Sequence, residues 1–159
     1  IYSIFNAKER LNKFHFLCPL VEIEPQYFYK LKNRTDIKLQ GLDDAKSYRI
    51  GVLREDYDHV YLKSQGFEDG INLDTNSQEE GNIRKLFKGR LDLVINSEQS
   101  IMAEIDKLNM DKSAVEKILK LPYSDEVQNC MALSLGTDKS IINSIKRALQ
   151  QVNSSNSEL

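Results

Sequence analysis

Polar side chains that could bind a small solute follow two apolar runs of the sequence. Arg54 and Asp56 come directly after one run, and Asn96 and Ser97 come directly after another. A guanidinium pairs with carboxylates, a carboxylate pairs with amines, and amide and hydroxyl groups hydrogen-bond to either. The four side chains therefore predict a binding site for a small polar molecule. Capping of helix N-termini would by itself also account for Asp56 and Ser97, so this alternative stays open.

Residues for catalysis or metal binding are sparse in the sequence. The two histidines, His15 and His59, lie in different segments, and Cys18 and Cys130 are far apart with no C-x-x-C spacing. A metal site needs several such ligands close together, and nucleophilic catalysis needs a nucleophile beside its base. We therefore predict no catalytic residue, no metal and no cofactor. For the cysteines we favour two buried thiols, with a single long-range disulfide as the alternative.

The composition is that of a globular domain that does not bind nucleic acid. The chain has 159 residues, of which 40% are hydrophobic and 29% charged, and its formal net charge is -2. A nucleic-acid surface needs a basic excess, and a membrane helix needs an apolar run of about 20 residues. The sequence contains neither, and it has no recognisable signal peptide. Because it begins with Ile1 rather than methionine, we expect a mature form or a fragment.

The elements that must position the four polar residues alternate between strands and helices. In chain order we predict a strand at 48–53, a helix at 56–65, a strand at 71–74, a helix from Asn76 or Ser77 to Lys88, a strand at 90–95 and a helix at 97–109. This alternation predicts an α/β fold with a mostly parallel sheet, helices on both faces and right-handed crossovers. Ligands of such sheets bind at the carboxyl edge, where both polar pairs would lie.

The segments on either side of this core are less regular. We predict extended pieces at 14–17 and 26–31, a helical turn at 41–46, a helix at 112–119, a strand at 127–135, and an amphipathic helix at 138–152 with a polar tail. Prolines stiffen the passage between the two extended pieces. We expect these segments to connect the α/β core to the rest of the protein.

Three segments resemble those of a known protein family. They read YRIGVLREDYDHVYLKSQGF, NSQEEGNIRKLFKGRLDLVIN and CMALSLGTDKSIINSIKRALQQV. In this order they look like the second lobe of the bacterial extracellular solute-binding proteins of amino-acid-type ABC transporters, which are periplasmic-binding-protein-like proteins of type 2. The resemblance extends from about residue 14 to residue 152.

The resemblance implies two α/β lobes joined by hinge strands, with a ligand held between the lobes. Residues 1–25 would be the end of the first lobe and the first hinge, 26–135 the second lobe, and 136–159 a return hinge helix with its polar tail. The strands at 27–31 and 130–135 would lie side by side near the hinge. The implied partners are a small polar solute, such as an amino acid or another carboxylate, and an ABC-transporter membrane permease. The implied location is periplasmic or extracellular.

The resemblance also assigns a role to Arg10 and leaves a gap at Ser97. Arg10 matches the family arginine that holds the ligand's α-carboxylate, although Lys8-Glu9-Arg10 also fits a surface charge. Family members that bind α-amino acids carry an aspartate at the position of Ser97. The small Gly-Thr or Gly-Ser pair expected after the first strand is Glu55-Asp56 here, so Asp56 could supply the missing carboxylate.

Two other functions stay open within the same resemblance. The two-lobed module also occurs as the sensing domain of signalling receptors, and a cyclohexadienyl-dehydratase-like enzyme has the same fold. The polar sequence at 153–156 does not lead into a membrane helix, and the chain has no nucleophile–histidine pair. We therefore favour a solute-binding module that is not an enzyme.

Overall fold

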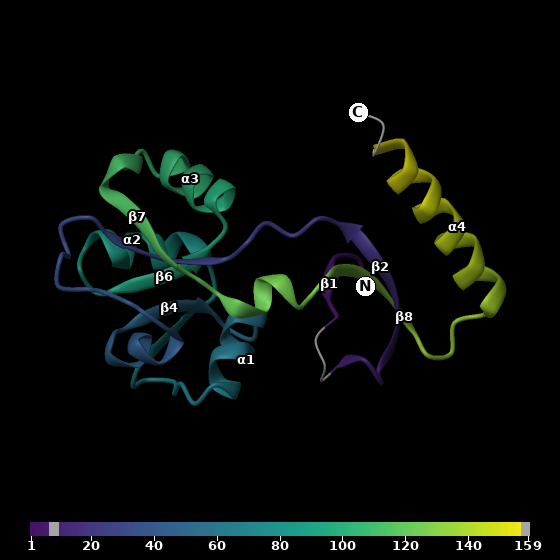
Figure 1. The fold of residues 1–159 in the computed structure, drawn as a ribbon, viewed down its shortest axis with the longest axis horizontal. Coiled ribbons are helices and arrows are strands. Elements are labelled where there is room, and N and C mark those ends of the chain that lie inside the picture. Colours follow the sequence, from purple (N-terminus) through teal and green to yellow (C-terminus); the bar gives the residue numbers. More distant parts are fainter. Residues whose placement is uncertain (7–9, 157–159) are drawn as a thin grey trace. The chain divides into compact units, whose positions relative to one another are not determined.

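The computed structural model describes residues 1–6 and 10–156, which divide into two compact units (Figure 1). Unit 1 contains Ile1–Ile23 and Glu126–Leu159, and unit 2 contains Glu24–Asp125. The chain therefore crosses between the units twice, after Ile23 and after Asp125. The assignment of these units to lobes of a larger protein stays a prediction.

Unit 2 is built on a five-stranded mixed sheet. Its strands lie in the order β5 (Leu73–Asn76), β4 (Ile50–Leu53), β6 (Leu93–Asn96), β3 (Tyr27–Leu31) and β7 (Val115–Lys120). β4 is parallel to β5 and β6, whereas β3 is antiparallel to β6 and β7. The predicted core of three parallel strands is therefore confirmed, and β3 and β7 extend it into a mixed sheet.

Helices cover both faces of this sheet, as the apolar strands predicted. The helices are α1 (Tyr57–Ser64), α2 (Glu79–Phe87) and α3 (Glu98–Lys107), and Figure 1 shows α1 on one side of the sheet and α2 and α3 on the other. Gly51 lets α2 approach β4 closely, because a Cβ there would lie 2.4 Å from Leu91 Cδ1 and 3.0 Å from Asn82 Oδ1. Ile50 and Val52 alternate with Gly51 and so face the opposite layer, where Leu62 of α1 is fully buried.

A buried cluster joins α2 and α3 to the sheet. Its buried members are Tyr29, Ile83, Leu86, Leu91, Val94, Ile101, Ile105 and Val115. They come from two helices, three strands and the turn before β6, so this layer is stabilised by apolar contacts between segments far apart in the sequence. Its position explains why Tyr29 of β3 and Val94 of β6 are buried on the face that α2 and α3 cover.

The segment 112–119 was predicted as a helix, and this prediction was wrong. A short 3-10 turn, η3 (Lys112–Ala114), is followed by the strand β7. Val-Glu-Lys-Ile-Leu-Lys fits the period of either element. Pairing with β3, in which Leu31 lies opposite Val115, provides the backbone hydrogen bonds that decide for a strand.

The cap of α2 also differs from the prediction, which placed it at Asn76 or Ser77. The N-cap residue is Gln78, and Asn76 is the last residue of β5, where it pairs with Leu53 of β4. The parallel ladder therefore extends the strand by two residues beyond its predicted end at Asp74. A shorter connection to α2 follows from this extension.

Unit 1 contains an antiparallel sheet and a long helix. Its strands lie in the order β1 (Ile4–Phe5), β8 (Asn129–Ser134) and β2 (Phe14–Val21), and α4 (Lys139–Asn156) follows β8 in the chain. The helix was predicted to end at Val152 and extends further, to Asn156. None of the helices in the described ranges is both long and apolar enough to cross a bilayer.

The predicted pairing of residues 27–31 with residues 130–135 was wrong. β3 lies between β6 and β7 in unit 2, whereas β8 lies between β1 and β2 in unit 1. Phe28 and Tyr29 are at most 1% exposed, which is typical of a central strand covered on both faces. The two strands thus belong to different sheets because each completes a different core.

A disulfide joins Cys18 of β2 to Cys130 of β8, so the preferred prediction of two thiols was wrong and the alternative is confirmed. The pairing of the two strands places Leu17 opposite Met131, and this register brings the cysteine Cα atoms to 4.5 Å. A bridge is possible only when that distance is below about 7 Å. The sequence separation of 112 between the two cysteines gave no local signal of this pairing.

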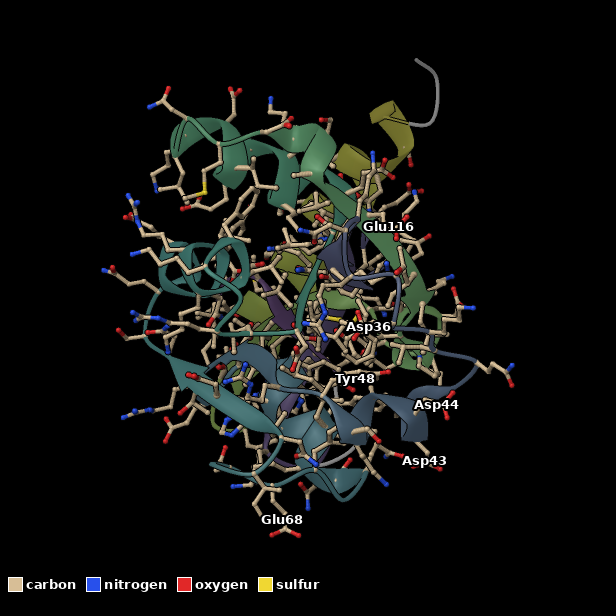
Figure 2. All side chains as sticks on the ribbon, turned by 90° about the vertical axis from the view of Figure 1, so that its left-hand side faces the viewer. Asp36, Asp43, Asp44, Tyr48, Glu68 and Glu116 are labelled. Carbon is tan, nitrogen blue, oxygen red and sulfur yellow. A yellow bond between two sulfur atoms is a disulfide. The ribbon has the colours of Figure 1, made fainter. Side chains whose placement is uncertain are left out.

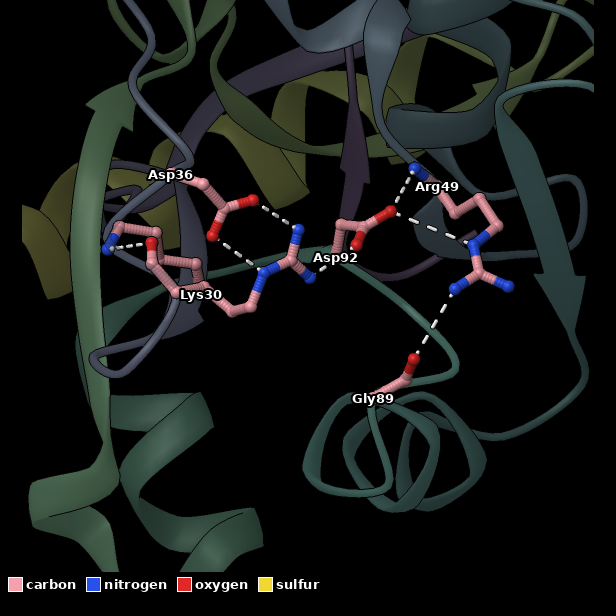
Figure 3. A network of polar contacts seen from close by, with 6 residues as sticks. Lys30, Asp36, Arg49, Gly89 and Asp92 are labelled. Atoms are coloured by element: carbon pink, nitrogen blue, oxygen red, sulfur yellow. Dashed lines mark hydrogen bonds and ion pairs between the residues drawn. The ribbon is translucent and has the colours of Figure 1, made fainter.

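The amino ends of β4 and β6 form one edge of the sheet in unit 2, which we call the amino edge. Asp92 directly precedes β6, and its carboxylate accepts hydrogen bonds from the Arg34 guanidinium (2.6 Å) and the Arg49 backbone N–H (2.9 Å) (Figure 3). Arg34 also pairs with Asp36, and Arg49 donates to the carbonyl of Gly89. Figure 2 is a view of unit 2 that labels Asp36 near the middle. The side chains of Asp43, Asp44 and Glu68 lie in the lower part of the same view.

Candidate functional site

The opposite edge of the same sheet, formed by the carboxyl ends of β4, β5 and β6, is the candidate functional site, and we call it the carboxyl edge. α1, α2 and α3 each begin there, because each follows one of these strands in the chain. Helix N-termini present free backbone N–H groups and a positive dipole end. β3 begins at the same edge, since Tyr27 pairs with Asn96, so the connection from unit 1 enters unit 2 there.

Arg54 and Asp56 lie at this edge, in the turn between β4 and α1. The backbone N–H of Arg54 donates to Asn76 of β5 at 2.9 Å, and its exposed guanidinium has no ion-pair partner within the described residues. Asp56 is the N-cap of α1, and its Oδ1 accepts the N–H of Tyr57 at 2.7 Å. The capping role of Asp56 is therefore confirmed, whereas ligand binding by Arg54 and Asp56 stays a prediction.

Asn96 and Ser97 lie at the end of β6, where both are engaged in local hydrogen bonds. Asn96 donates from Nδ2 to Glu79 at 3.0 Å and accepts the Ser97 N–H at 3.0 Å. Ser97 is the N-cap of α3, accepts the Ser100 N–H at 3.2 Å, and is 4% exposed. The capping role predicted for Ser97 is confirmed, and Asn96 connects β6 to the first turn of α2.

Arg10, the fifth predicted site residue, belongs to unit 1. It is half-buried, and its carbonyl accepts the N–H of Lys13 at 2.9 Å. The other four predicted residues belong to unit 2. The structure thus brings those four to one edge, and the participation of Arg10 stays a prediction.

Two carboxylates at the carboxyl edge were missed as site residues. Asp58 lies in the first turn of α1 and accepts a hydrogen bond from the hydroxyl of Tyr123, which belongs to the 3-10 turn η4 (Pro122–Asp125). Glu79 lies in the first turn of α2 and accepts a hydrogen bond from the side-chain amide of Asn96. Both are half-buried, and neither has an ion-pair partner in the part of the chain that the structure describes.

Their environment makes both carboxyl groups unusually weak acids. Burial raises the pKa of Asp58 to about 7, although the Tyr123 hydrogen bond opposes the rise, and Asp56 adds to it. Burial and the nearby charge of Asp58 raise the pKa of Glu79 to about 7, against the opposing hydrogen bond from Asn96. The sequence places both acids in the first turn of a helix at the predicted edge, but this position did not distinguish them from acids that only stabilise a helix N-terminus.

A cluster of tyrosines lies beside Asp58. The ring centroid of Tyr123 lies 4.8 Å from that of Tyr57 and 4.7 Å from that of Tyr61, and both pairs have edge-to-face geometry. Burial and the charge of Asp58 raise the pKa of Tyr123, which keeps its hydroxyl a donor. Aromatic rings next to carboxylates form an environment that suits an organic cation.

A pocket of about 460 Å³ lies beside the turn after β4. Its lining includes Arg54, Glu55, His59, Lys63 and Asp69. The carboxylate of Asp69 accepts hydrogen bonds from Lys63 (2.8 Å) and His59 (2.7 Å), and these two hydrogen bonds lower its pKa. Asp69 on this wall is therefore paired with a cation, in contrast to Asp58 and Glu79. Among the described residues, no group of histidine, cysteine and acidic side chains is arranged to hold a metal.

Known proteins resemble this chain in sequence and in fold. No family model matches it. A probable amino-acid-binding protein, YxeM, of Bacillus subtilis (strain 168) is 28% identical over 102 residues, which cover 64% of this chain and 38% of that protein. The chain thus spans well under half the length of this curated relative.

Solved structures match almost the whole chain. A histidine kinase sensor domain with similarity to periplasmic binding proteins has a TM-score of 0.78 at 17% identity, and an ancestral arginine-binding protein bound to arginine has a TM-score of 0.73 at 18% identity. Each match covers 98% of this chain and 64% of the other. An amino acid ABC transporter substrate-binding protein from Streptococcus pneumoniae, bound to L-arginine, has a TM-score of 0.71 at 19% identity and is covered over 60% of its length.

The fold is therefore that of the periplasmic-binding-protein-like proteins. The chain resembles, over part of their length, the substrate-binding proteins of amino-acid ABC transporters, which confirms the resemblance stated from the sequence.

Proposed function

We propose that this chain is part of the substrate-binding protein of an ABC importer, and that its carboxyl edge binds an amino acid carrying a cationic group. The observation that carries the proposal is the pair of half-buried carboxylates, Asp58 and Glu79, at the edge where β4, β5 and β6 end. A carboxylate taken from water without a cation is destabilised, and a ligand ammonium or guanidinium relieves that cost. The proposed location is the periplasm or the cell exterior.

The proposed ligand contacts divide by charge. Asp58 and Glu79 receive the cationic group, beside the tyrosine cluster of Tyr57, Tyr61 and Tyr123. Arg54 pairs with the ligand carboxylate, since a guanidinium fork matches a carboxylate in two hydrogen bonds. For Arg10, the carboxylate-binding role stays the one that the family resemblance implies. Asp56, Asn96 and Ser97 contribute to the edge and also hold its helices in place. The arginine-bound structures of similar fold support this choice of ligand class.

A sensor domain is the second candidate, because a histidine kinase sensor domain shares the fold with a TM-score of 0.78. The ligand site would be the same, and the partner would be a kinase rather than a permease. No catalytic step belongs to either candidate. The named relatives are binding proteins and a sensor, which supports a module that is not an enzyme.

The test is calorimetric titration of the full-length gene product with L-arginine, L-glutamine and L-glutamate at pH 8. We expect L-arginine to bind tightest, and we expect the double variant Asp58→Asn/Glu79→Gln to lose about tenfold or more in arginine affinity, because hydrogen bonds to charged groups are lost. The matched control is Asp43→Asn/Glu68→Gln, which removes two exposed carboxylates outside this edge. Preferred binding of L-glutamate, or equal arginine affinity in both double variants, would contradict the proposal.

A further inference from the structure

The turn between β4 and α1 contains a residue in an unfavourable backbone conformation. Glu55 has φ +61°, in the left-handed region where a side chain crowds the following carbonyl. Its neighbours are fixed on both sides: Arg54 N–H donates to Asn76 at 2.9 Å, and Asp56 caps α1. A conformation of this kind persists only where surrounding contacts hold it.

His59 supplies such a contact from the next turn of the chain. The backbone N–H of Glu55 donates to His59 Nδ1 at 3.0 Å, and the His59 side chain is largely buried. A nitrogen that accepts a hydrogen bond carries no proton, so in this neutral ring the proton is on Nε2. Nε2 accordingly donates to Asp69 at 2.7 Å.

Asp69 fixes this arrangement from the other side. Its second oxygen pairs with Lys63 at 2.8 Å, and the hydrogen bonds from Lys63 and His59 lower its pKa, so it stays an acceptor. A chain of contacts thus runs from Lys63 through Asp69 and His59 to the Glu55 backbone. Second hydrogen bonds of this kind set both the tautomer and the orientation of an imidazole.

We propose that His59 is a positioning residue of the carboxyl edge. By accepting the Glu55 N–H, it holds the turn so that Arg54 and Asp56 stay at the edge before a ligand arrives. A site ordered in advance loses less conformational entropy on binding. The inference rests on the proposed function for its effect on affinity, whereas the hydrogen bond to Glu55 can be tested without any ligand.

Two amide substitutions separate the roles of the two ring nitrogens. An asparagine at position 59 places an acceptor where Nδ1 lies, whereas the longer glutamine places its amide near Nε2 and leaves the Glu55 N–H without an acceptor. In the full-length protein we expect His59→Gln to bind L-arginine about five- to tenfold more weakly, and His59→Asn to stay within about twofold of the parent.

Backbone strain offers an independent rescue. Glycine adopts φ near +61° without steric cost, so the turn in Glu55→Gly depends less on His59. We expect the affinity lost in His59→Gln to be smaller in the Glu55→Gly background than in the parent. Additive effects of the two substitutions would overturn the positioning role, because residues that act on one turn are energetically coupled.

Hydrogen exchange of the Glu55 amide decides the proposal in the absence of ligand. We expect exchange on the order of tenfold faster in His59→Gln than in the parent, and close to the parent rate in His59→Asn. Equal Glu55 exchange rates in His59→Gln and the parent would overturn the inference, whatever the ligand. If the parent fails to bind L-arginine while Glu55 exchange changes as expected, the proposed function fails and the positioning of the turn by His59 stands.

Discussion

The two edges of the sheet in unit 2 place half-buried carboxylates in opposite surroundings. At the amino edge, Asp92 receives an arginine side chain and a backbone N–H (Figure 3), and these hydrogen bonds lower its pKa although burial acts to raise it. At the carboxyl edge, burial raises the pKa of Asp58 and of Glu79 to about 7, and no described cation pairs with either. The acid at the amino edge is therefore paired with a cation, whereas Asp58 and Glu79 at the carboxyl edge are not paired with any described cation.

This difference indicates that the charged residues at the two ends of these strands have different roles. The charges before β4 and β6 join strands and turns to one another and so contribute to folding. The acids after these strands are held by a tyrosine hydroxyl and an amide, which satisfy oxygen atoms without neutralising charge. A cationic ligand can pair with Asp58 and Glu79, whereas Asp92 at the amino edge is already paired with Arg34.

The largest expected effect is on the stability of the amino edge. Asp92→Ala should lower the free energy of unfolding by about 2–3 kcal/mol, because it leaves Arg34 and the Arg49 N–H without their shared acceptor. Urea unfolding followed by circular dichroism measures this loss. Asp36→Ala removes the exposed partner of the same Arg34 and should lower the free energy of unfolding by less than Asp92→Ala does. Equal losses in the two variants would show that the edge does not depend on Asp92.

The pH dependence of stability should differ between the edges. The raised pKa values of Asp58 and Glu79 mean that the folded state holds more protons than the unfolded state between about pH 4 and 7, so their contribution falls as pH rises through this window. The lowered pKa of Asp92 acts in the opposite sense, and its contribution is lost only as pH falls below about 4.

Unfolding measured at successive pH values tests this contrast. From pH 5 to 8 the free energy of unfolding of the parent should fall by on the order of 1 kcal/mol. The variant Asp58→Asn/Glu79→Gln should not show this fall, because its amides cannot ionise. The exposed-site control Asp43→Asn/Glu68→Gln should follow the parent. A parent profile that is flat over this range would remove the electrostatic basis of the comparison.

The capping role of Ser97 predicts a loss of about 1 kcal/mol in Ser97→Ala, because the Ser100 N–H loses its acceptor. Ser97→Thr keeps a hydroxyl at the cap and should lose less. Thermal unfolding measures stability, and titration with L-arginine measures affinity in the same samples. A large loss of affinity in the threonine variant would reveal a direct ligand contact beyond the cap.

The smallest effect concerns Asn96, whose amide lowers the pKa of Glu79. Asn96→Ala should therefore raise that pKa above about 7, at a stability cost of no more than about 1 kcal/mol. Carbon NMR titration of the Glu79 carboxyl group measures the shift directly. An unchanged or lowered pKa would mean that the Asn96 amide does not contribute to the carboxylate's environment.

Much of the site's framework was predictable from local pattern. The buried strand at 50–53, the capped helix after it and the polar pair after β6 all follow from short-range periodicity and capping preferences. The acids at positions 58 and 79 carried no such signal of function. Their first-turn positions suit helix capping, and only their burial without a cation distinguishes them from ordinary surface acids.

What the sequence by itself determined is the α/β alternation, the edge at which the polar residues gather, and the caps at Asp56 and Ser97, since these depend on residues a few positions apart. Only the tertiary structure decided that residues 115–120 form a strand, that Cys18 meets Cys130, and that β3 and β8 enter different sheets. Each of these depends on pairing between distant segments, where burial and backbone hydrogen bonding outweigh local preference.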